Sequence, residues 1–142
     1  MNGFLLDTNV ISELVTKRPE PTVSQWVEDT DETLLHLSVL TLGEIRKGIA
    51  GLPQARRRAE LENWLNLGLR GRFAGRILPI DAEVADRWGR VAAQARSMNI
   101  QLPVIDGLLA ATALEHDLTF VTRNTGDVAG MGVLVLNPWE KF

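Results

Sequence analysis

The chain has 142 residues, 45% of them hydrophobic and 23% charged, which suits one soluble globular domain over residues 1–142 with its own core. The absence of cysteine excludes disulfide and thiolate chemistry, and a net charge of −3 argues against a surface that coats nucleic acid broadly. No apolar run is long enough to span a membrane and the first residues do not resemble a secretory signal, so we expect a cytoplasmic protein without a membrane partner.

The first predicted element is a buried strand over residues 4–6 that ends directly in Asp7, Thr8 and Asn9. We expect Thr8 or Asn9 to cap the short helix that follows, because small polar residues satisfy the free N–H groups at a helix start. In open parallel sheets, ligands bind beyond the carboxyl ends of the strands. Asp7 is therefore the first candidate for a functional site.

Strands and helices alternate along the rest of the chain. Pro79 places the third strand near an edge of the sheet, and Asp81 is expected to cap the helix after it. The alternation predicts an α/β fold, a three-layer α/β/α sandwich around a central parallel sheet of about five strands. The further strands are predicted over residues 34–38, 76–80, 118–122 and 133–136, and the helices over residues 10–15, 21–29, 39–50, 55–71, 82–98 and 104–116.

Four polar sites interrupt apolar structure where the predicted strands and helices meet. Asp7 ends the first strand, and Glu44 lies early in the helix after the second strand. Asp106 is an isolated charge in the first turn of the apolar helix before the fourth strand, and the loop after that strand contains Asn124 and Asp127. In a doubly wound parallel sheet all of these points fall on the same rim, so we expect one shared site.

Each acid also has a purely structural interpretation. Asp7 could cap the first helix, and Glu44 could form a capping box with Thr41. Asp106 could be placed where the helix dipole stabilises a negative charge, and Asp127 could be an ordinary turn residue. Four separate structural roles on one rim are less expected than one common cause, and the shared site is therefore the favoured interpretation.

Carboxylates crowded into one site repel each other, and a divalent cation would relieve that repulsion. Oxygen ligands without a cysteine or histidine cluster favour Mg²⁺ or Mn²⁺ over Zn²⁺. Such an ion can bind a phosphate oxygen, activate water and stabilise the leaving oxygen, which suits phosphoryl chemistry on a polyanionic substrate. Arg46, Lys47 and Arg123 adjoin the predicted site residues and could contact backbone phosphates.

Four segments carry a resemblance to a known family. They are LDTNVISEL at residues 6–14, SVLTLGEI at 38–45, PVIDGLLAATA at 103–113 and VTRNTGD at 121–127. In these motifs, and in their order along the whole chain, the protein resembles the PIN-domain ribonucleases. It specifically resembles the VapC toxins of VapBC type II toxin–antitoxin modules, in the FitB-like branch. Asp-Thr-Asn alone would be a weak signal, whereas four motifs at the ends of successive units are specific.

The resemblance implies a single PIN-like nuclease domain that cleaves RNA endonucleolytically at an acidic Mg²⁺ or Mn²⁺ pocket. It implies that Asp7 and Asp106 are the main metal ligands. Glu44 would complete the acidic triad by holding the metal or by orienting the attacking water. Thr8 would support the site through its hydroxyl group.

The fourth corner of the implied site departs from many relatives. Asn124 stands where an acid is often found, so Asp127 becomes the candidate for the fourth acid, and the choice between one and two metals stays open. The resemblance further implies a homodimer and a small cognate antitoxin whose C-terminal segment blocks the pocket, in a higher assembly on operator DNA.

Two other classes of protein share parts of the pattern. A phosphatase of the haloacid-dehalogenase type also begins with a strand that ends in Asp, but it requires a second Asp where this chain has Asn9. A catalytically silent PIN-fold module that acts with an antitoxin on operator DNA would keep the fold without the chemistry. The intact acids favour the nuclease, and a nuclease screen with Mg²⁺ and Mn²⁺ separates the three.

Overall fold

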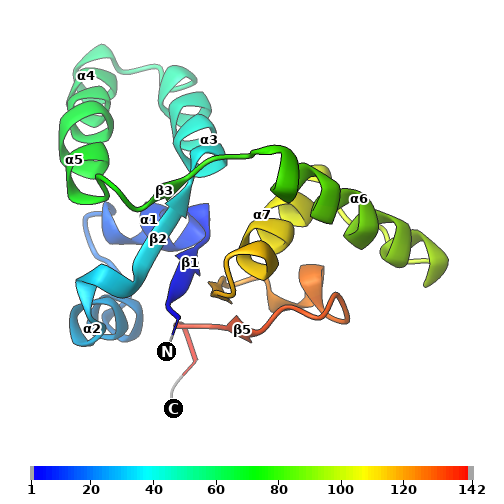
Figure 1. Cartoon of the computed structure of the whole chain (residues 1–142). Coiled ribbons are helices and arrows are strands. Elements are labelled where there is room, and N and C mark those ends of the chain that lie inside the picture. The colour runs from blue at the N-terminus through cyan, green and yellow to red at the C-terminus, as the bar shows by residue number, and fades with distance from the viewer. Residues whose placement is uncertain (1, 141–142) are drawn as a thin grey trace.

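Five short parallel strands form the central sheet of the computed structural model, which describes residues 2–140 (Figure 1). The strand order is β3–β2–β1–β4–β5, so the strand followed by Pro79 lies at an edge as predicted. The predicted α/β fold is confirmed, although several strands are shorter than expected. The bounds are Phe4–Leu6 for β1, Leu35–Ser38 for β2, Ile77–Leu78 for β3, Thr119–Val121 for β4 and Val135–Leu136 for β5.

The central strand, β1, contributes side chains to both faces of the sheet. Phe4 and Leu6 belong to one hydrophobic cluster, which includes residues of α1, α2 and α3, whereas Leu5 belongs to a second cluster with residues of α7. Helices therefore cover both faces and give the three predicted layers (Figure 1). The helices are α1 (Thr8–Leu14), α2 (Pro21–Asp29), α3 (Val39–Ala50), α4 (Ala55–Asn63), α5 (Arg70–Arg72), α6 (Ala82–Ser97) and α7 (Val104–Glu115), with short 3-10 turns η1 (Glu32–Leu34) and η3 (Thr125–Val128).

The start of α1 differs from the prediction. Asp7 is the N-cap residue: its backbone is extended, and its Oδ1 atom accepts a hydrogen bond from the Thr8 N–H at 2.7 Å. The expectation that Thr8 or Asn9 caps the helix is therefore wrong, because Thr8 is already the first helical residue. The carboxylate that ends the first strand is thus fixed by the helix that it starts.

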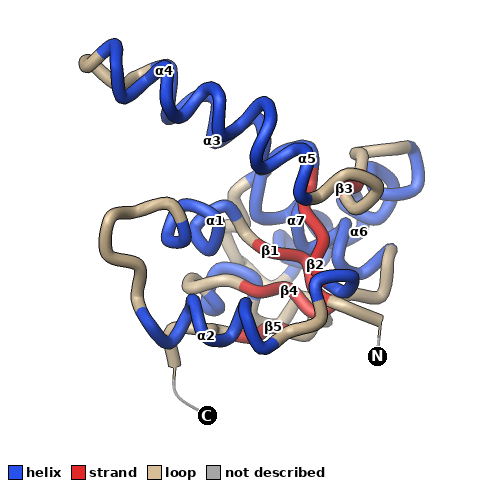
Figure 2. Tube along the Cα trace, turned by 90° about the vertical axis from the view of Figure 1, so that its left-hand side faces the viewer, coloured by secondary structure: helices blue, strands red, loops and turns tan. Residues whose placement is uncertain are grey.

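A helical hairpin formed by α3 and the segment after it projects from the sheet (Figure 2). The predicted helix over residues 55–71 consists of α4, a π-helical segment η2 at Trp64–Leu69, and α5. Leu65, Leu69 and Phe73 are buried at a spacing of four residues. A row with that spacing drifts around an α-helix, and the wider π turn offsets the drift. The π segment therefore keeps these side chains directed at the core.

The outermost helix, α6, packs directly against α7. Asp81 caps α6 as predicted, since its Oδ1 atom accepts a hydrogen bond from the Val84 N–H at 2.9 Å. The two helices approach closely at Gly107, where a Cβ atom would lie 3.0 Å from the indole nitrogen of Trp88. Within residues 2–140, none of the helices has the length and apolar character that crossing a bilayer requires.

Candidate active site

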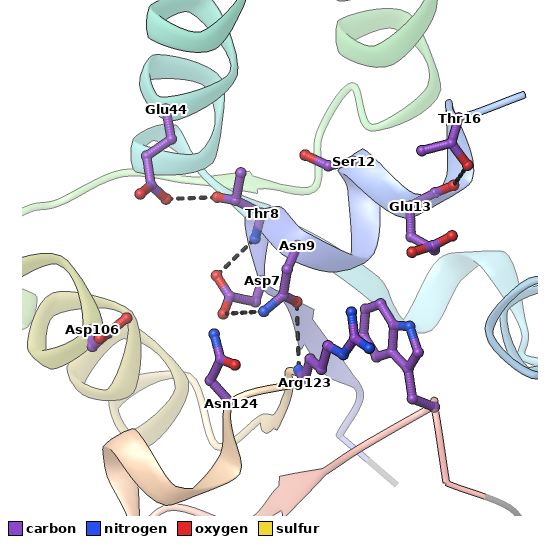
Figure 3. Close-up of a pocket in the computed structure, with 11 residues that line it drawn as sticks. Asp7, Thr8, Asn9, Ser12, Glu13, Thr16, Glu44, Asp106, Arg123 and Asn124 are labelled. Atoms are coloured by element: carbon purple, nitrogen blue, oxygen red, sulfur yellow. Dashed lines mark hydrogen bonds between the residues drawn. The ribbon is translucent and has the colours of Figure 1, made fainter. Parts of the chain in front are cut away.

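One pocket at the carboxyl ends of the strands brings together residues that lie far apart in the sequence (Figure 3). Asp7, Glu44 and Asp106 all line it, as the sequence predicts. The pocket has a volume of about 460 Å³ and opens between α1, α3, α7 and the loop after β4. Its full lining consists of Asp7, Thr8, Asn9, Ser12, Glu13, Thr16, Glu44, Asp106, Arg123, Asn124 and Trp139.

Asp7 is the most firmly held acid of the pocket. It is 8% exposed, and both of its carboxylate oxygens accept hydrogen bonds. The Thr8 N–H donates to Oδ1 at 2.7 Å, whereas the Thr122 hydroxyl and the Asn9 amide donate to Oδ2 at 2.8 and 3.4 Å. Capping is therefore only half of its role, because one oxygen serves the helix and the other belongs to a polar network.

The Thr122 hydroxyl is the centre of that network. It donates to Asp7, and it accepts a hydrogen bond from the Asn9 side-chain amide at 3.3 Å and from the Asn124 backbone N–H at 3.1 Å. Thr122 follows β4 and is 1% exposed. One buried hydroxyl thus connects the end of β1, the start of α1 and the loop after β4.

Glu44 is oriented by Thr8 and does not form the capping box considered above. The N-cap of α3 is Ser38, whose hydroxyl accepts a hydrogen bond from the Leu40 N–H, so Thr41 lies inside the helix. The Thr8 hydroxyl donates to Glu44 Oε1 at 2.6 Å (Figure 3). The supporting position suggested for Thr8 corresponds to this direct contact between α1 and α3.

Burial and mutual repulsion raise the pKa values of two of the acids. Burial is the largest cause for Asp7, and the hydrogen bonds described above oppose it, while the charges of Glu44 and Asp127 add to the rise. Burial also raises the pKa of Asp106, and the charges of Asp127, Asp7 and Glu44 raise it further. The charges of Glu44 and Asp127 therefore lie near enough to disfavour ionisation of Asp7 and Asp106.

The chemistry of these donors fits a hard divalent cation. Among residues 2–140, no ion pair neutralises Asp7, Glu44 or Asp106. In the same range, no three acidic or histidine side chains stand close enough to form a complete metal-binding group. Mg²⁺ usually takes only one or two protein carboxylates and completes its shell with water and phosphate, and Asp7 and Asp106 are the residues that would supply them.

The two candidates for the fourth corner occupy different places. Asn124 lines the pocket, whereas Asp127 lies in the exposed turn η3 and is absent from the lining residues. Asp127 nevertheless raises the pKa values of Asp7 and Asp106 through its charge. Asn124 is thus the candidate that lines the pocket, whereas Asp127 affects the pocket acids through its charge.

Of the three cations predicted to contact phosphates, Arg123 lines the pocket. Arg46 and Lys47 are exposed on α3, outside the lining residues, and the Arg46 guanidinium donates a hydrogen bond to the Asn66 side chain. Contact between these two residues and RNA stays a prediction.

Sequence reasoning missed several lining residues. Asn9, Ser12 and Glu13 share one polar face of α1, and Thr16 continues the spacing of three and four residues just beyond the end of that helix. That periodicity could have identified them. Trp139 follows the last strand and gave no comparable signal, because its place in the pocket depends on how the chain folds back after β5.

Comparison with known proteins agrees with this architecture. The PIN domain family matches residues 4–129. The VapC ribonuclease Y4jK of Sinorhizobium fredii is 36% identical over 137 residues, which are 96% of this chain and 98% of that protein. Toxin FitB of Neisseria gonorrhoeae is 38% identical over 137 residues, which are 96% and 99% of the two chains. A solved structure of FitAB bound to an IR36 DNA fragment matches with a TM-score of 0.93 and 35% identity, covering 98% of this chain and 97% of that one.

The parallel sheet with an acidic pocket at its carboxyl edge thus defines an α/β protein of the PIN class. The chain belongs to the PIN-domain family, in the branch of the VapC and FitB toxins. The resemblance inferred from the four sequence motifs is confirmed.

Proposed function

We propose that this protein is a Mg²⁺- or Mn²⁺-dependent endoribonuclease that serves as the toxin of a toxin–antitoxin module. The observation that carries the proposal is the pocket that Asp7, Glu44 and Asp106 line together, with none of the three in an ion pair among the described residues. The name of the VapC ribonuclease relative supports the choice of RNA as substrate.

The roles of the residues follow from their surroundings. Asp7 and Asp106 would hold the ion, which when bound polarises the scissile phosphate and lowers the pKa of a water ligand. Thr8 holds Glu44 at the rim through the hydrogen bond of 2.6 Å, so Glu44 can accept a proton from the attacking water. Arg123 is the cation placed to receive a backbone phosphate, since it lines the same pocket.

The test is cleavage of RNA by the purified chain and its Asp7→Asn and Asp106→Asn variants, with Mn²⁺ and with EDTA. We expect cleavage by the wild type only with the metal, and losses of about a hundredfold or more in both variants. Asp86→Asn is the matched control, because Asp86 pairs with Arg90 on α6, outside the pocket lining. Robust cleavage by Asp106→Asn, or full activity in EDTA, would end the assignment.

The same relatives support a partner assembly. FitAB has been solved bound to an IR36 DNA fragment, and we propose that this chain likewise binds a cognate antitoxin and reaches operator DNA with it. A homodimer in the cytoplasm fits such an assembly. Expression of the chain alone should arrest growth, and expression of Asp106→Asn should not.

The competing proposal is a silent PIN-fold module that only binds an antitoxin on operator DNA. The DNA-bound FitAB structure supports a DNA-bound assembly but is compatible with either proposal. Ribonuclease activity that requires Asp106 separates them. The phosphatase alternative lacks support in the site, because Asn9 is an amide that donates to Asp7 where a second acid is required.

A further inference from the structure

Arg123 has unusual surroundings for an arginine in an acidic pocket. The other charged lining residues are Asp7, Glu13, Glu44 and Asp106. Where an arginine pairs with a carboxylate, the pair is frequently bidentate. Here the guanidinium carbon lies 5.1 Å from the centre of the Trp139 ring, and none of the ion pairs among residues 2–140 includes Arg123.

Trp139 is itself well anchored. It is half-buried and packs against the hydrophobic cluster on the α1 side of the sheet. Its backbone N–H donates to Asn137 Oδ1 at 2.9 Å, and the Asn137 amide donates to the Arg123 carbonyl oxygen at 3.4 Å. The Arg123 N–H in turn donates to Asn9 Oδ1 at 3.5 Å. The segment after β5 is thereby tied to the loop after β4 and to α1.

The aromatic contact and a carboxylate pair would have opposite consequences for the site. A pair with Asp7 or Glu13 would neutralise a pocket acid and would occupy the guanidinium. Stacking on an indole stabilises the cation but adds no negative charge, so the full positive charge stays available on the other side. The planar donor fork of an arginine matches the oxygens of a phosphate.

We propose that Trp139 is a positioning residue, which holds the Arg123 guanidinium away from the pocket acids so that it receives a backbone phosphate of RNA. The proposal rests on the proposed ribonuclease function and assigns a role to a residue beyond the segment that the PIN family matches, residues 4–129. Trp139 acts through Arg123 in this arrangement, and it takes no part in the chemical step.

The test is a double-mutant cycle of Trp139→Leu and Arg123→Gln, made in the full-length Asp106→Asn protein so that the probe is not cut. The probe is a labelled single-stranded RNA oligonucleotide of mixed sequence, and its affinity is measured in EDTA at several salt concentrations. Each single variant should weaken binding about threefold to thirtyfold, the range expected from loss of a cation–π contact. The double variant should bind as weakly as Arg123→Gln and no more weakly.

The salt dependence separates positioning from packing. Each phosphate contact contributes about 0.7 to the slope of log affinity against log salt for a single strand. Trp139→Leu removes no charge, yet it should lower the slope by about the same amount as Arg123→Gln if the guanidinium is misplaced. Trp139→Phe keeps an aromatic face and should restore most of the slope.

Matched variants control for loss of an aromatic ring and of a cation. Trp26→Leu removes a half-buried tryptophan that packs on the same cluster, edge-on to Phe4, outside the pocket lining, and it should leave the salt slope unchanged. Arg96→Gln removes an exposed cation from the last turn of α6 and should also leave it unchanged. Trp139→Met, with a flexible apolar side chain, replaces Trp139→Leu if that variant does not fold.

Three results would overturn the proposal. One is an unchanged salt slope in Trp139→Leu. Another is a loss of RNA affinity on Trp139→Leu that is just as large in the Arg123→Gln background, which would indicate that Trp139 acts by base stacking or general packing. The third is a wild-type protein that does not cleave RNA, which would refute the proposed function as well. If the wild type cleaves RNA and either of the first two results is found, only the role of Trp139 is refuted.

Discussion

Replacement of Gly107 by alanine tests the close approach of α6 and α7 that places Asp106 at the pocket. A Cβ atom at residue 107 would lie 3.0 and 3.1 Å from two atoms of the Trp88 indole and 3.2 Å from Leu102. Overpacking of this kind costs about 1–3 kcal/mol. Alanine gains about 1 kcal/mol over glycine inside a helix, so we expect a net destabilisation of about 0–2 kcal/mol.

Gly89→Ala is the matched control, because Gly89 is also helical and a Cβ atom there meets nothing within 4 Å. It should stabilise the protein by about 0.5–1 kcal/mol. Urea unfolding measures both values, and each kcal/mol should move the melting temperature by about 3 °C for a chain of this size. RNA cleavage should fall in Gly107→Ala but not in Gly89→Ala, since only the former displaces the helix turn that carries Asp106. Equal stabilisation by the two alanines would refute the described packing.

Three further predictions concern the acids. Burial raises the pKa of Asp7, so the native state binds the proton of this carboxyl more tightly than the unfolded chain does. The protonated carboxyl therefore contributes its full stabilisation below about pH 4, and this contribution declines as the pH rises through the raised pKa. In EDTA, Asp7→Asn should gain stability relative to the wild type over that pH interval, and a difference that stays constant with pH would contradict this. Mn²⁺ at a hundred times its dissociation constant should stabilise the native wild-type protein by about 3 kcal/mol and so raise its melting temperature by several degrees. Asp106→Asn should lose this shift. Asp81→Ala should cost about 1 kcal/mol in urea unfolding by removing the cap of α6, whereas Asp86→Ala should change stability little.

The sheet and the acidic pocket could be predicted because their signals are local. A short apolar run that ends in Asp7, and an isolated acid in the first turn of an apolar helix, are visible in the sequence, and parallel topology brings them to one rim. The parts that escaped prediction depend on contacts between distant segments. The hydrogen bond from Asn9 to Thr122 joins residues 113 positions apart, and the stacking of Arg123 on Trp139 requires the final segment to fold back over the pocket.

The wrong prediction for the cap of α1 has a similar origin. Several small polar residues compete for each helix start, and the choice between them depends on where the preceding strand ends. Asp7 caps α1 because β1 stops at Leu6, and Ser38 caps α3 because it is the last residue of β2. The N-cap preferences of Asp, Asn, Ser and Thr are too similar for the sequence alone to show which of them caps a given helix.

Under the proposed function, the single hydroxyl oxygen of Thr122 offers a short evolutionary route to an inactive protein. Valine has nearly the same shape as threonine, so Thr122→Val would preserve the packing after β4 while removing the one atom that joins Asp7, Asn9 and the Asn124 backbone. A cell that carries a harmful gene gains from mutations that disarm its product without unfolding it. An inactive chain that still folds would compete with active copies for the same antitoxin. The fraction of active toxin that is inhibited would then change without any change in the amount of active toxin or of antitoxin.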